Sequence, residues 1–142
     1  MDIKKIFLDT NIVLDIIEPR RKSHEQALQL GEYLLLNDYE ICISEDMITT
    51  IFYISSSKQE SLIFIKEVIL VDWQIISFGK DIIKNAIDLS LEKNLDLEDI
   101  LQCFCAKENG CIAFITNDKK FHDCGISLYT IEEFLKEIDV QK

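Results

Sequence analysis

Short apolar runs alternate with segments of helical periodicity along the whole chain. The runs that predict buried strands are "IKKIFLD" at 3–9, "EICIS" at 40–44, "WQIISF" at 73–78, "CIAFITND" at 111–118 and "ISLYT" at 126–130. Helical spacing of apolar residues occurs at 10–17, 24–36, 44–54, 60–71, 80–94, 96–110 and 131–138. Strands that alternate with helices form βαβ units, which predicts an α/β fold. We expect a three-layer α/β/α sandwich with a mainly parallel central sheet, in a single domain over residues 1–142.

The same periodicity predicts the core-facing side of two helices and the residues that begin two others. The expected inner face of 24–36 consists of Ala27, Leu28, Gly31, Leu34 and Leu35. The expected inner face of 80–94 consists of Ile82, Ile83, Ala86, Ile87 and Ser90. We expect Thr10 or Asn11 to cap the first helix, and Ser44 to cap the helix after the second strand.

The composition is typical of a packed globular protein. Of the 142 residues, 48 % are hydrophobic, which allows one sizeable core. No apolar run approaches the roughly 20 residues of a membrane helix, and "MDIKKIFLD" lacks the features of a signal peptide. We therefore expect a cytoplasmic protein outside the membrane. The five cysteines include no C-x-x-C pair, so we expect free thiols that pack as small hydrophobic residues, not a zinc site.

The formal net charge of −11 narrows the possible roles in nucleic-acid binding. Broad, charge-driven binding needs many Lys and Arg residues to neutralise phosphates. Any such role must therefore be local, or assisted by metal ions or a partner protein. The basic residues that could hold RNA phosphates are Arg20, Arg21 and Lys22 in "EPRRK", together with Lys119 and Lys120. The alternative is that "EPRRK" is a solvated loop.

Acidic residues follow the most apolar strands and open two of the helices. Asp9 ends "KIFLD" and Asp118 follows "AFIT", so in a parallel sheet both carboxylates reach the same edge. Asp99 opens a later helix, and Glu45 and Asp46 open the helix after "EICIS". Carboxylates that share a cleft raise one another's pKa, and a hard cation such as Mg²⁺ or Mn²⁺ relieves the repulsion. This group of acids predicts phosphodiester hydrolysis by metal-activated water.

Each acid also has a purely structural interpretation. Asp9 could cap the helix that follows it, and Asp118 could belong to an ordinary turn. Asp99 could complement a helix dipole, as could the acids after the second strand. Asp96 is expected to cap the helix of Asp99 and not to bind a ligand. The conjunction of these acids therefore indicates a metal site more strongly than any one of them.

Three segments of the chain resemble the PIN domain. They are "FLDTNIVLD", "LEDILQCFCAKENGCIAFITNDKKF" and "GISLYTIEEFL", and the resemblance covers nearly the whole chain in the expected order. PIN domains are metal-dependent ribonucleases, and bacterial toxins of the VapC type belong among them. The resemblance implies an α/β/α sandwich with a parallel sheet and a cluster of acids that holds Mg²⁺ or Mn²⁺.

The resemblance also implies roles for residues at matching positions. Asp9 matches the first family acid, and Asn11 matches the polar residue that supports it. Asp99 matches the acid that opens the later helix. Asp118 matches the last acid, and Thr116 is the hydroxyl residue that precedes it. By this resemblance the metal ligands are Asp9, Asp99 and Asp118.

The second family acid is the position at which this sequence departs from the pattern. Many relatives carry Glu inside the helix after the second strand, where this chain has Thr50. Glu45 or Asp46, one turn earlier, could substitute, and we include Glu45 among the candidate catalytic residues. If neither residue substitutes, the site has three acids.

Two functions from different classes are consistent with these residues. The first is a metal-dependent endoribonuclease that acts on RNA and is the toxin of a toxin–antitoxin pair. Its expected partner is a small antitoxin protein. A homodimer is a further assembly to test. The second is a PIN-fold protein that has lost catalysis and binds RNA or protein. A phosphatase of the haloacid dehalogenase kind needs Asp-x-Asp, whereas residue 11 is Asn, which cannot act as the general acid.

Overall fold

The apolar runs form a five-stranded parallel sheet in the computed structural model, which describes residues 3–141. The strands are β1 (Lys5–Leu8), β2 (Glu40–Ser44), β3 (Gln74–Ile76), β4 (Ala113–Ile115) and β5 (Ser127–Tyr129). Their spatial order is β3-β2-β1-β4-β5, and every neighbouring pair is parallel. The prediction of a parallel central sheet is therefore confirmed.

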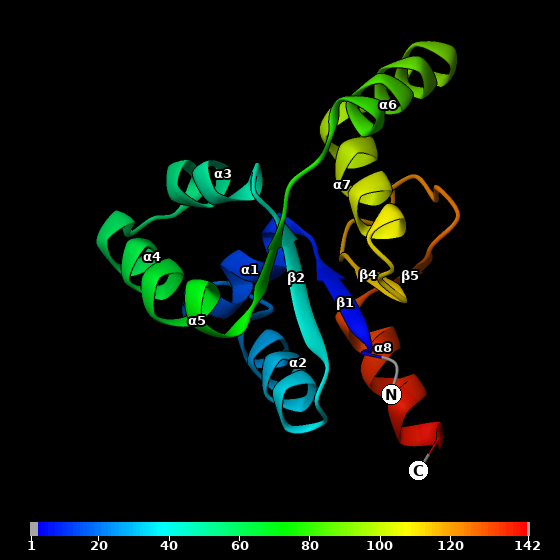
Figure 1. Cartoon of the computed structure of the whole chain (residues 1–142). Coiled ribbons are helices and arrows are strands. Elements are labelled where there is room, and N and C mark those ends of the chain that lie inside the picture. Colours follow the sequence, from blue (N-terminus) through cyan, green and yellow to red (C-terminus); the bar gives the residue numbers. More distant parts are fainter. Residues whose placement is uncertain (1–2, 142) are drawn as a thin grey trace.

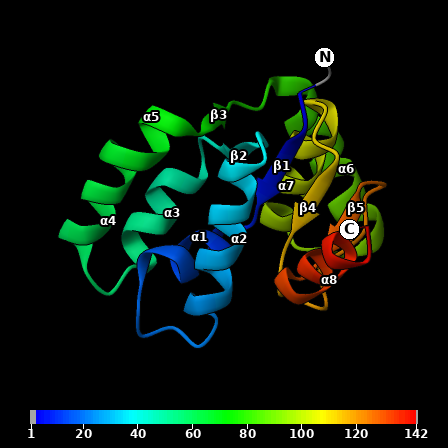
Figure 2. The same cartoon turned by 90° about the horizontal axis from the view of Figure 1, so that it is seen from below.

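Helices cover both faces of the sheet. They are α1 (Thr10–Ile17), α2 (His24–Leu36), α3 (Met47–Ile54), α4 (Lys58–Phe64), the π-helical η1 (Ile65–Ile69), α5 (Leu70–Asp72), α6 (Lys80–Lys93), α7 (Leu97–Glu108) and α8 (Ile131–Gln141). Figures 1 and 2 show α1 to α5 on one side of the sheet, and α6 with α7 on the other. Helix α8 packs against α2 and β5. This arrangement confirms the α/β/α sandwich.

The centre of the core lies where β1 meets β4. Ile6, Phe7 and Leu8 are fully buried, because a central parallel strand is covered on both faces. The rings of Phe7 and Phe114 stack with centroids 5.1 Å apart, and Phe121 packs on Phe114 at 4.7 Å. These contacts hold the ends of β1 and β4 beside each other.

The order of the strands places a topological switch point between β1 and β4. The chain passes from β1 to β2 and β3 on one side, then returns to place β4 and β5 on the other side. In open parallel sheets, ligands bind beyond the carboxyl ends of the strands at such a point. Asp9 directly follows β1, and Asp118 lies three residues after the last residue of β4.

The predicted inner faces of α2 and α6 are partly wrong. Leu28 and Leu35 of α2 are 45 % and 48 % exposed, whereas Leu30 and Leu34 are buried. In α6, Ala86 is buried, while Ile83 and Ile87 are 39 % and 40 % exposed. The physical reason for α6 is that it packs on α7 and extends away from the sheet (Figure 1), so only a narrow side of it is covered.

The caps predicted for the first helix and for the helix after the second strand are also wrong. Asp9, and neither Thr10 nor Asn11, caps α1, because its side chain accepts a hydrogen bond from the Thr10 amide. Ser44 is the last residue of β2, and α3 begins at Met47 after Asp46. The buried Ser44 hydroxyl has no hydrogen-bond partner among residues 3–141.

Two of the five cysteines are not free, which corrects the expectation from the sequence. Cys103 of α7 forms a disulfide with Cys124, in the segment between β4 and β5. Cys42, Cys105 and Cys111 are free and buried, as expected. Within the described part of the chain, no helix is both long and apolar enough to cross a membrane.

Candidate active site

Asp9 is held from two directions at the end of β1. Its Oδ1 accepts a hydrogen bond from the Thr10 amide at 2.8 Å, and its Oδ2 accepts one from the Thr116 hydroxyl at 2.7 Å. Its own amide donates to the Ile115 carbonyl at 3.0 Å, which continues the pairing of β1 with β4. Each carboxylate oxygen has a further lone pair, so the capping role leaves Asp9 able to bind a cation.

Thr116 links Asp9 to Asp118. While its hydroxyl donates to Asp9, the same oxygen accepts a hydrogen bond from the Asp118 amide at 3.1 Å. The Asp118 Oδ1 accepts from the Lys120 amide at 2.9 Å, which is the geometry of an Asx turn. A single buried hydroxyl therefore sets the relative positions of the two acids that follow β1 and β4.

Asp99 comes to this group from the first turn of α7. As expected, Asp96 is the N-cap of that helix, since its Oδ1 accepts from the Asp99 amide at 3.1 Å. Burial raises the pKa of Asp99 to about 6, together with the negative charges of Asp96, Asp9 and Asp118. Burial also raises the pKa of Asp9, and the charge of Asp118 adds to this shift. The three acids therefore share one electrostatic environment.

Glu45 and Asp46, the two acids after β2, contact different parts of the protein. A carboxylate oxygen of Glu45 accepts a hydrogen bond from the Ser77 hydroxyl, beside the outer strand β3. The Oδ2 of Asp46 lies 3.5 Å from Nε2 of Gln102, one turn after Asp99 on α7. The structure therefore brings Asp46, and not Glu45, to the group around Asp99.

Sequence analysis missed two residues at this edge. Burial raises the pKa of Glu98, and the charges of Asp46, Asp96 and Asp9 add to the shift. Gln102 is 1 % exposed, and its Oε1 has no hydrogen-bond partner among the described residues. The signal for Gln102 is an amide among the apolar residues of the buried face of α7. Glu98 stands in the first turn of a helix, where the helix dipole alone accounts for an acid, so no pattern singled it out.

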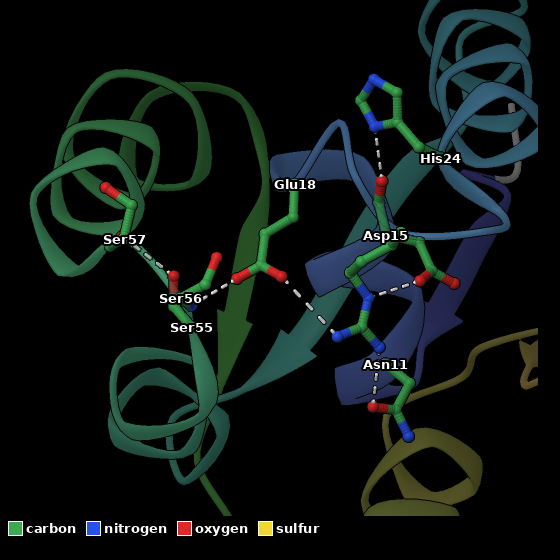
Figure 3. Close-up of polar contacts among 8 residues, drawn as sticks. Asn11, Asp15, Glu18, His24, Ser55, Ser56 and Ser57 are labelled. Carbon is green, nitrogen blue, oxygen red and sulfur yellow. Dashed lines mark hydrogen bonds and ion pairs between the residues drawn. The ribbon is translucent and has the colours of Figure 1, made fainter.

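Arg21 is engaged within the protein. Its Nε lies 2.7 Å from Asp15 Oδ1, and its Nη1 lies 3.7 Å from Glu18 Oε2. Its Nη2 donates to the side-chain oxygen of Asn11 at 3.3 Å. Figure 3 shows Asn11, Asp15 and Glu18 around this position, and Glu18 also reaches the segment 55–57. An expected contact between Arg21 and substrate stays a prediction, as does one for the exposed Arg20.

Glu18 completes this second group of charges. Its Oε1 accepts a hydrogen bond from the Ser56 amide at 2.7 Å, which ties the end of α1 to the segment before α4. Burial acts to raise the pKa of Glu18, but hydrogen bonds from Ser56 and Ser55 and the charge of Arg21 outweigh it and lower the pKa. We call Asp15, Glu18 and Arg21 the arginine group, and Asp9, Asp99 and Asp118 the acid group.

The acid group has the donor chemistry of a site for a hard cation. Among residues 3–141, no three Asp, Glu, His or Cys side chains converge closely enough to form a ready-made metal cage. Mg²⁺ does not need one, since it keeps several waters and commonly binds one or two carboxylates. The raised pKa values of Asp9 and Asp99 mean that their negative charge is poorly compensated by the protein itself. These residues therefore fit Mg²⁺ or Mn²⁺.

Comparison with known proteins identifies relatives over almost the whole chain. The family model of the PIN domain matches residues 6–126. The chain is 41 % identical over 138 residues to "Ribonuclease VapC1" of Aquifex aeolicus (strain VF5), covering 94 % of this chain and 95 % of the relative. The match to the family model includes the positions of Asp9, Asp99 and Asp118.

Solved structures share the fold at lower sequence identity. The crystal structure of Mycobacterium tuberculosis VapC20, a sarcin-ricin loop cleaving toxin, has a TM-score of 0.68 at 12 % identity, over 85 % of this chain and 95 % of that one. VapBC2 from Rickettsia felis, bound to a promoter DNA fragment, has a TM-score of 0.66 at 21 % identity, with 89 % and 98 % covered. A toxin–antitoxin complex from Klebsiella pneumoniae has a TM-score of 0.66 at 20 % identity, with 89 % and 97 % covered. By its sequence match and its fold, the chain belongs to the PIN domain family.

Proposed function

We propose that this protein is a Mg²⁺- or Mn²⁺-dependent endoribonuclease, the toxin of a toxin–antitoxin pair. The observation that carries the proposal is the acid group at the switch point of the sheet, where Asp9 and Asp118 share the Thr116 hydroxyl. The name of the Aquifex aeolicus relative, a ribonuclease, supports the reaction. The toxin named in the Mycobacterium tuberculosis structure and the two toxin–antitoxin assemblies support the biological role.

In the proposed mechanism, the protein residues hold the cation and orient the RNA phosphate. Asp9, Asp99 and Asp118 would supply carboxylate oxygens, and Thr116 would keep Asp9 and Asp118 in register. The bound cation would lower the pKa of a water molecule and offset charge on the phosphate in the transition state. The pKa of Asp99 is raised to about 6, so this side chain is protonated at lower pH. Because a protonated carboxyl group is a poor cation ligand, cation binding would weaken as the pH falls below about 6.

We assign the position of the missing second family acid to Asp46 in place of Glu45. Asp46 faces α7, where Gln102 lies within 3.5 Å of its carboxylate and its charge acts on Glu98. Glu45 instead accepts its hydrogen bond from Ser77 near the outer strand. Asp46 would bind a cation through water or orient one of its waters, because its carboxylate is exposed to solvent.

The proposal includes a small antitoxin protein as partner, a cytoplasmic location and RNA as substrate. The Rickettsia felis and Klebsiella pneumoniae assemblies support the antitoxin. A cavity of about 270 Å³ beside α1, α4 and η1 offers a surface for it that is apolar except for two acids; it is lined by Ile17, Ile63, Phe64, Val68, Glu60 and Glu67. A homodimer is a separate proposal, tested by light scattering of the isolated protein.

The decisive experiment measures RNA cleavage with Mg²⁺ or Mn²⁺ by the wild type and by the variants Asp9→Asn and Asp118→Asn. We expect cleavage that both substitutions reduce by about 100-fold or more, because each removes a cation ligand. Asp38→Asn is the matched control, since residue 38 lies before β2 at the opposite edge and Asn tolerates its positive φ. Circular dichroism would verify that all variants fold. Equal cleavage by wild type and Asp9→Asn would disprove the assignment.

A second candidate function is a PIN-fold protein that binds RNA or protein without catalysis. The observation in its favour is Thr50, which stands where many relatives carry an acid. The same assay distinguishes the two functions. Tight Mn²⁺ binding by calorimetry with no RNA cleavage in either metal would support the binding protein.

A further inference from the structure

We propose that a cavity beside the acid group binds a nucleotide of the RNA strand, with Lys22 and Lys119 holding its phosphates. The cavity has a volume of about 810 Å³ and lies between the start of α2, the segment after β4 and the start of α8. This volume is in the range of small-molecule sites, roughly 300 to 1,000 Å³. The inference rests on the proposed ribonuclease function and names a binding site for its substrate.

The cavity is continuous with the acid group. Thr116 and Asp118 line its wall, and the same two residues position the acids at the ends of β1 and β4. A strand whose scissile phosphate lies at the acid group would therefore place a neighbouring nucleotide in this cavity.

The positive charge of the cavity wall is concentrated on two residues. Three lysines line it, and Lys136 is paired, with its Nζ 3.0 Å from Glu132 Oε1. Lys22 and Lys119 have no ion pair and no side-chain hydrogen bond among the described residues. Hydrogen bonds lower the pKa of Glu133 and the charge of Lys119 contributes to this shift, but Lys119 forms no ion pair with Glu133. In a chain with a net charge of −11, two lysines without an ion pair at one cavity provide the local phosphate contact that the overall charge does not.

The wall also holds three acids, Asp118, Glu132 and Glu133, and the last of them caps the start of α8. Glu133 Oε1 accepts a hydrogen bond from the Thr130 amide at 2.8 Å, and the Thr130 hydroxyl accepts one from the Glu133 amide at 3.1 Å. This is a capping box. The backbone therefore engages the Glu133 carboxylate, which lessens its competition with phosphate for the lysines.

Polar and aromatic groups suited to a base lie on the same wall. The side-chain oxygen of Asn117 accepts from the Ile131 amide at 3.1 Å, and its NH₂ group has no partner among the described residues. The ring of Tyr129, braced edge-on by Phe134, and the exposed amide of Gln26 also line the cavity. Single-stranded RNA is recognised by such stacking surfaces and amide hydrogen bonds.

Exposed lysines elsewhere on the surface supply controls for the two lysines. Lys66 and Lys93 are exposed and carry the same charge, but neither lines the cavity. Neutralising either of them changes the long-range field of the protein almost as much as neutralising Lys22 or Lys119. The four variants therefore separate a contact in the cavity from general charge attraction.

The test measures the affinity of Asp9→Asn protein for a fluorescein-labelled, single-stranded RNA oligonucleotide, by anisotropy over a range of salt concentrations. We expect Lys22→Gln and Lys119→Gln each to weaken binding by about five- to ten-fold, and to lower the slope of log affinity against log salt by about 0.7. We expect Lys66→Gln and Lys93→Gln to change affinity by less than about two-fold. Equal losses for all four variants, or none for Lys22→Gln and Lys119→Gln, would overturn the proposal.

A second pair of variants fills the cavity without changing charge. Gln26 and Gln29 are both exposed on α2, but only Gln26 lines the cavity. We expect Gln26→Trp to raise KM for RNA cleavage about ten-fold with little change in kcat, and Gln29→Trp to leave both unchanged. An unchanged KM for Gln26→Trp would contradict the cavity as a binding site. Failure of the wild type to cleave RNA would instead refute the proposed function, which keeps the two outcomes distinct.

Discussion

The acid group and the arginine group lie at opposite ends of α1 and differ in how the protein compensates their charge. At the C-terminal end, Arg21 lies 2.7 Å from Asp15, and the pKa of Glu18 is lowered. At the N-terminal end, the pKa values of Asp9 and Asp99 are raised, and no Lys or Arg in the described part of the chain forms an ion pair with them.

The difference separates a cluster whose charges are balanced within the protein from the proposed cation site. The arginine group is internally balanced, so its residues contribute to stability and tie α1 to the segment before α4. The acid group keeps an excess of negative charge at an open edge of the sheet, which costs stability and favours an external cation. Substitutions in the two groups should therefore have opposite effects on activity and stability.

The largest expected effect comes from Asp99→Asn, which removes one negative charge from the acid group. We expect RNA cleavage to fall by about 100-fold or more, because the proposed cation site loses one of its ligands. The free energy of unfolding, measured in urea without divalent cations, should stay equal or rise, because repulsion is relieved. If Asp99→Asn lost activity because it unfolded, the acid group would contribute to stability as the arginine group does, and the proposed difference between the two groups would be wrong.

Arg21→Met should have the opposite effect. It leaves the buried carboxylate of Asp15 without its partner, and we expect a loss of about 2 kcal/mol in the free energy of unfolding. Its matched control, Arg20→Met, removes the same charge from an exposed neighbour and should cost less than about 0.5 kcal/mol. Urea denaturation of both variants measures the difference. Equal stabilities would show that the arginine group is not a stabilising cluster.

Asp46→Asn and Glu45→Gln test the edge of the acid group. We expect Asp46→Asn to lower the affinity for Mn²⁺ by about ten-fold, an effect typical of residues that orient metal ligands or their waters. Glu45→Gln should leave it within about two-fold, since its carboxylate faces Ser77. Isothermal titration calorimetry gives both affinities. If Glu45→Gln weakened Mn²⁺ binding more than Asp46→Asn, Glu45 would take the position of the second family acid.

The smallest effect is a pH dependence of stability. The pKa of Asp99 is raised from 3.8 to about 6 in the folded protein, so the folded state binds this proton more tightly than the unfolded chain. Without divalent cations, stability should therefore fall as the pH rises from about 4 to about 6. Because Asp99 is partly exposed, we expect a loss of about 1 kcal/mol after allowance for solvent screening.

The comparison that isolates this effect is wild type against Asp99→Asn in urea at several pH values. The wild type should lose stability relative to the variant over this interval, and Mg²⁺ at pH 7 should restore it. A constant difference between the two proteins across the interval would contradict a raised pKa for Asp99.

Sequence patterns predicted the strands well because the central strands are buried on both faces. Ile6–Leu8 and Ala113–Ile115 form continuous apolar runs with few other interpretations, and the acids that follow them had to meet at one edge. Helix faces were predicted less well. Ile83 and Ile87 have the spacing of core residues, but α6 packs on α7 and extends away from the sheet (Figure 1).

The sequence by itself determined the parallel α/β sandwich, the placement of Asp9 and Asp118 at its carboxyl edge, and the first-turn position of Asp99. Only the tertiary structure placed Asp46 beside Gln102 and Glu45 beside Ser77, tied Arg21 to Asp15, and joined Cys103 to Cys124. The physical reason is the range of the interactions. Hydrophobic periodicity is local and survives in the one-dimensional pattern, whereas these pairings depend on which side chains from different elements come within a few ångströms of one another.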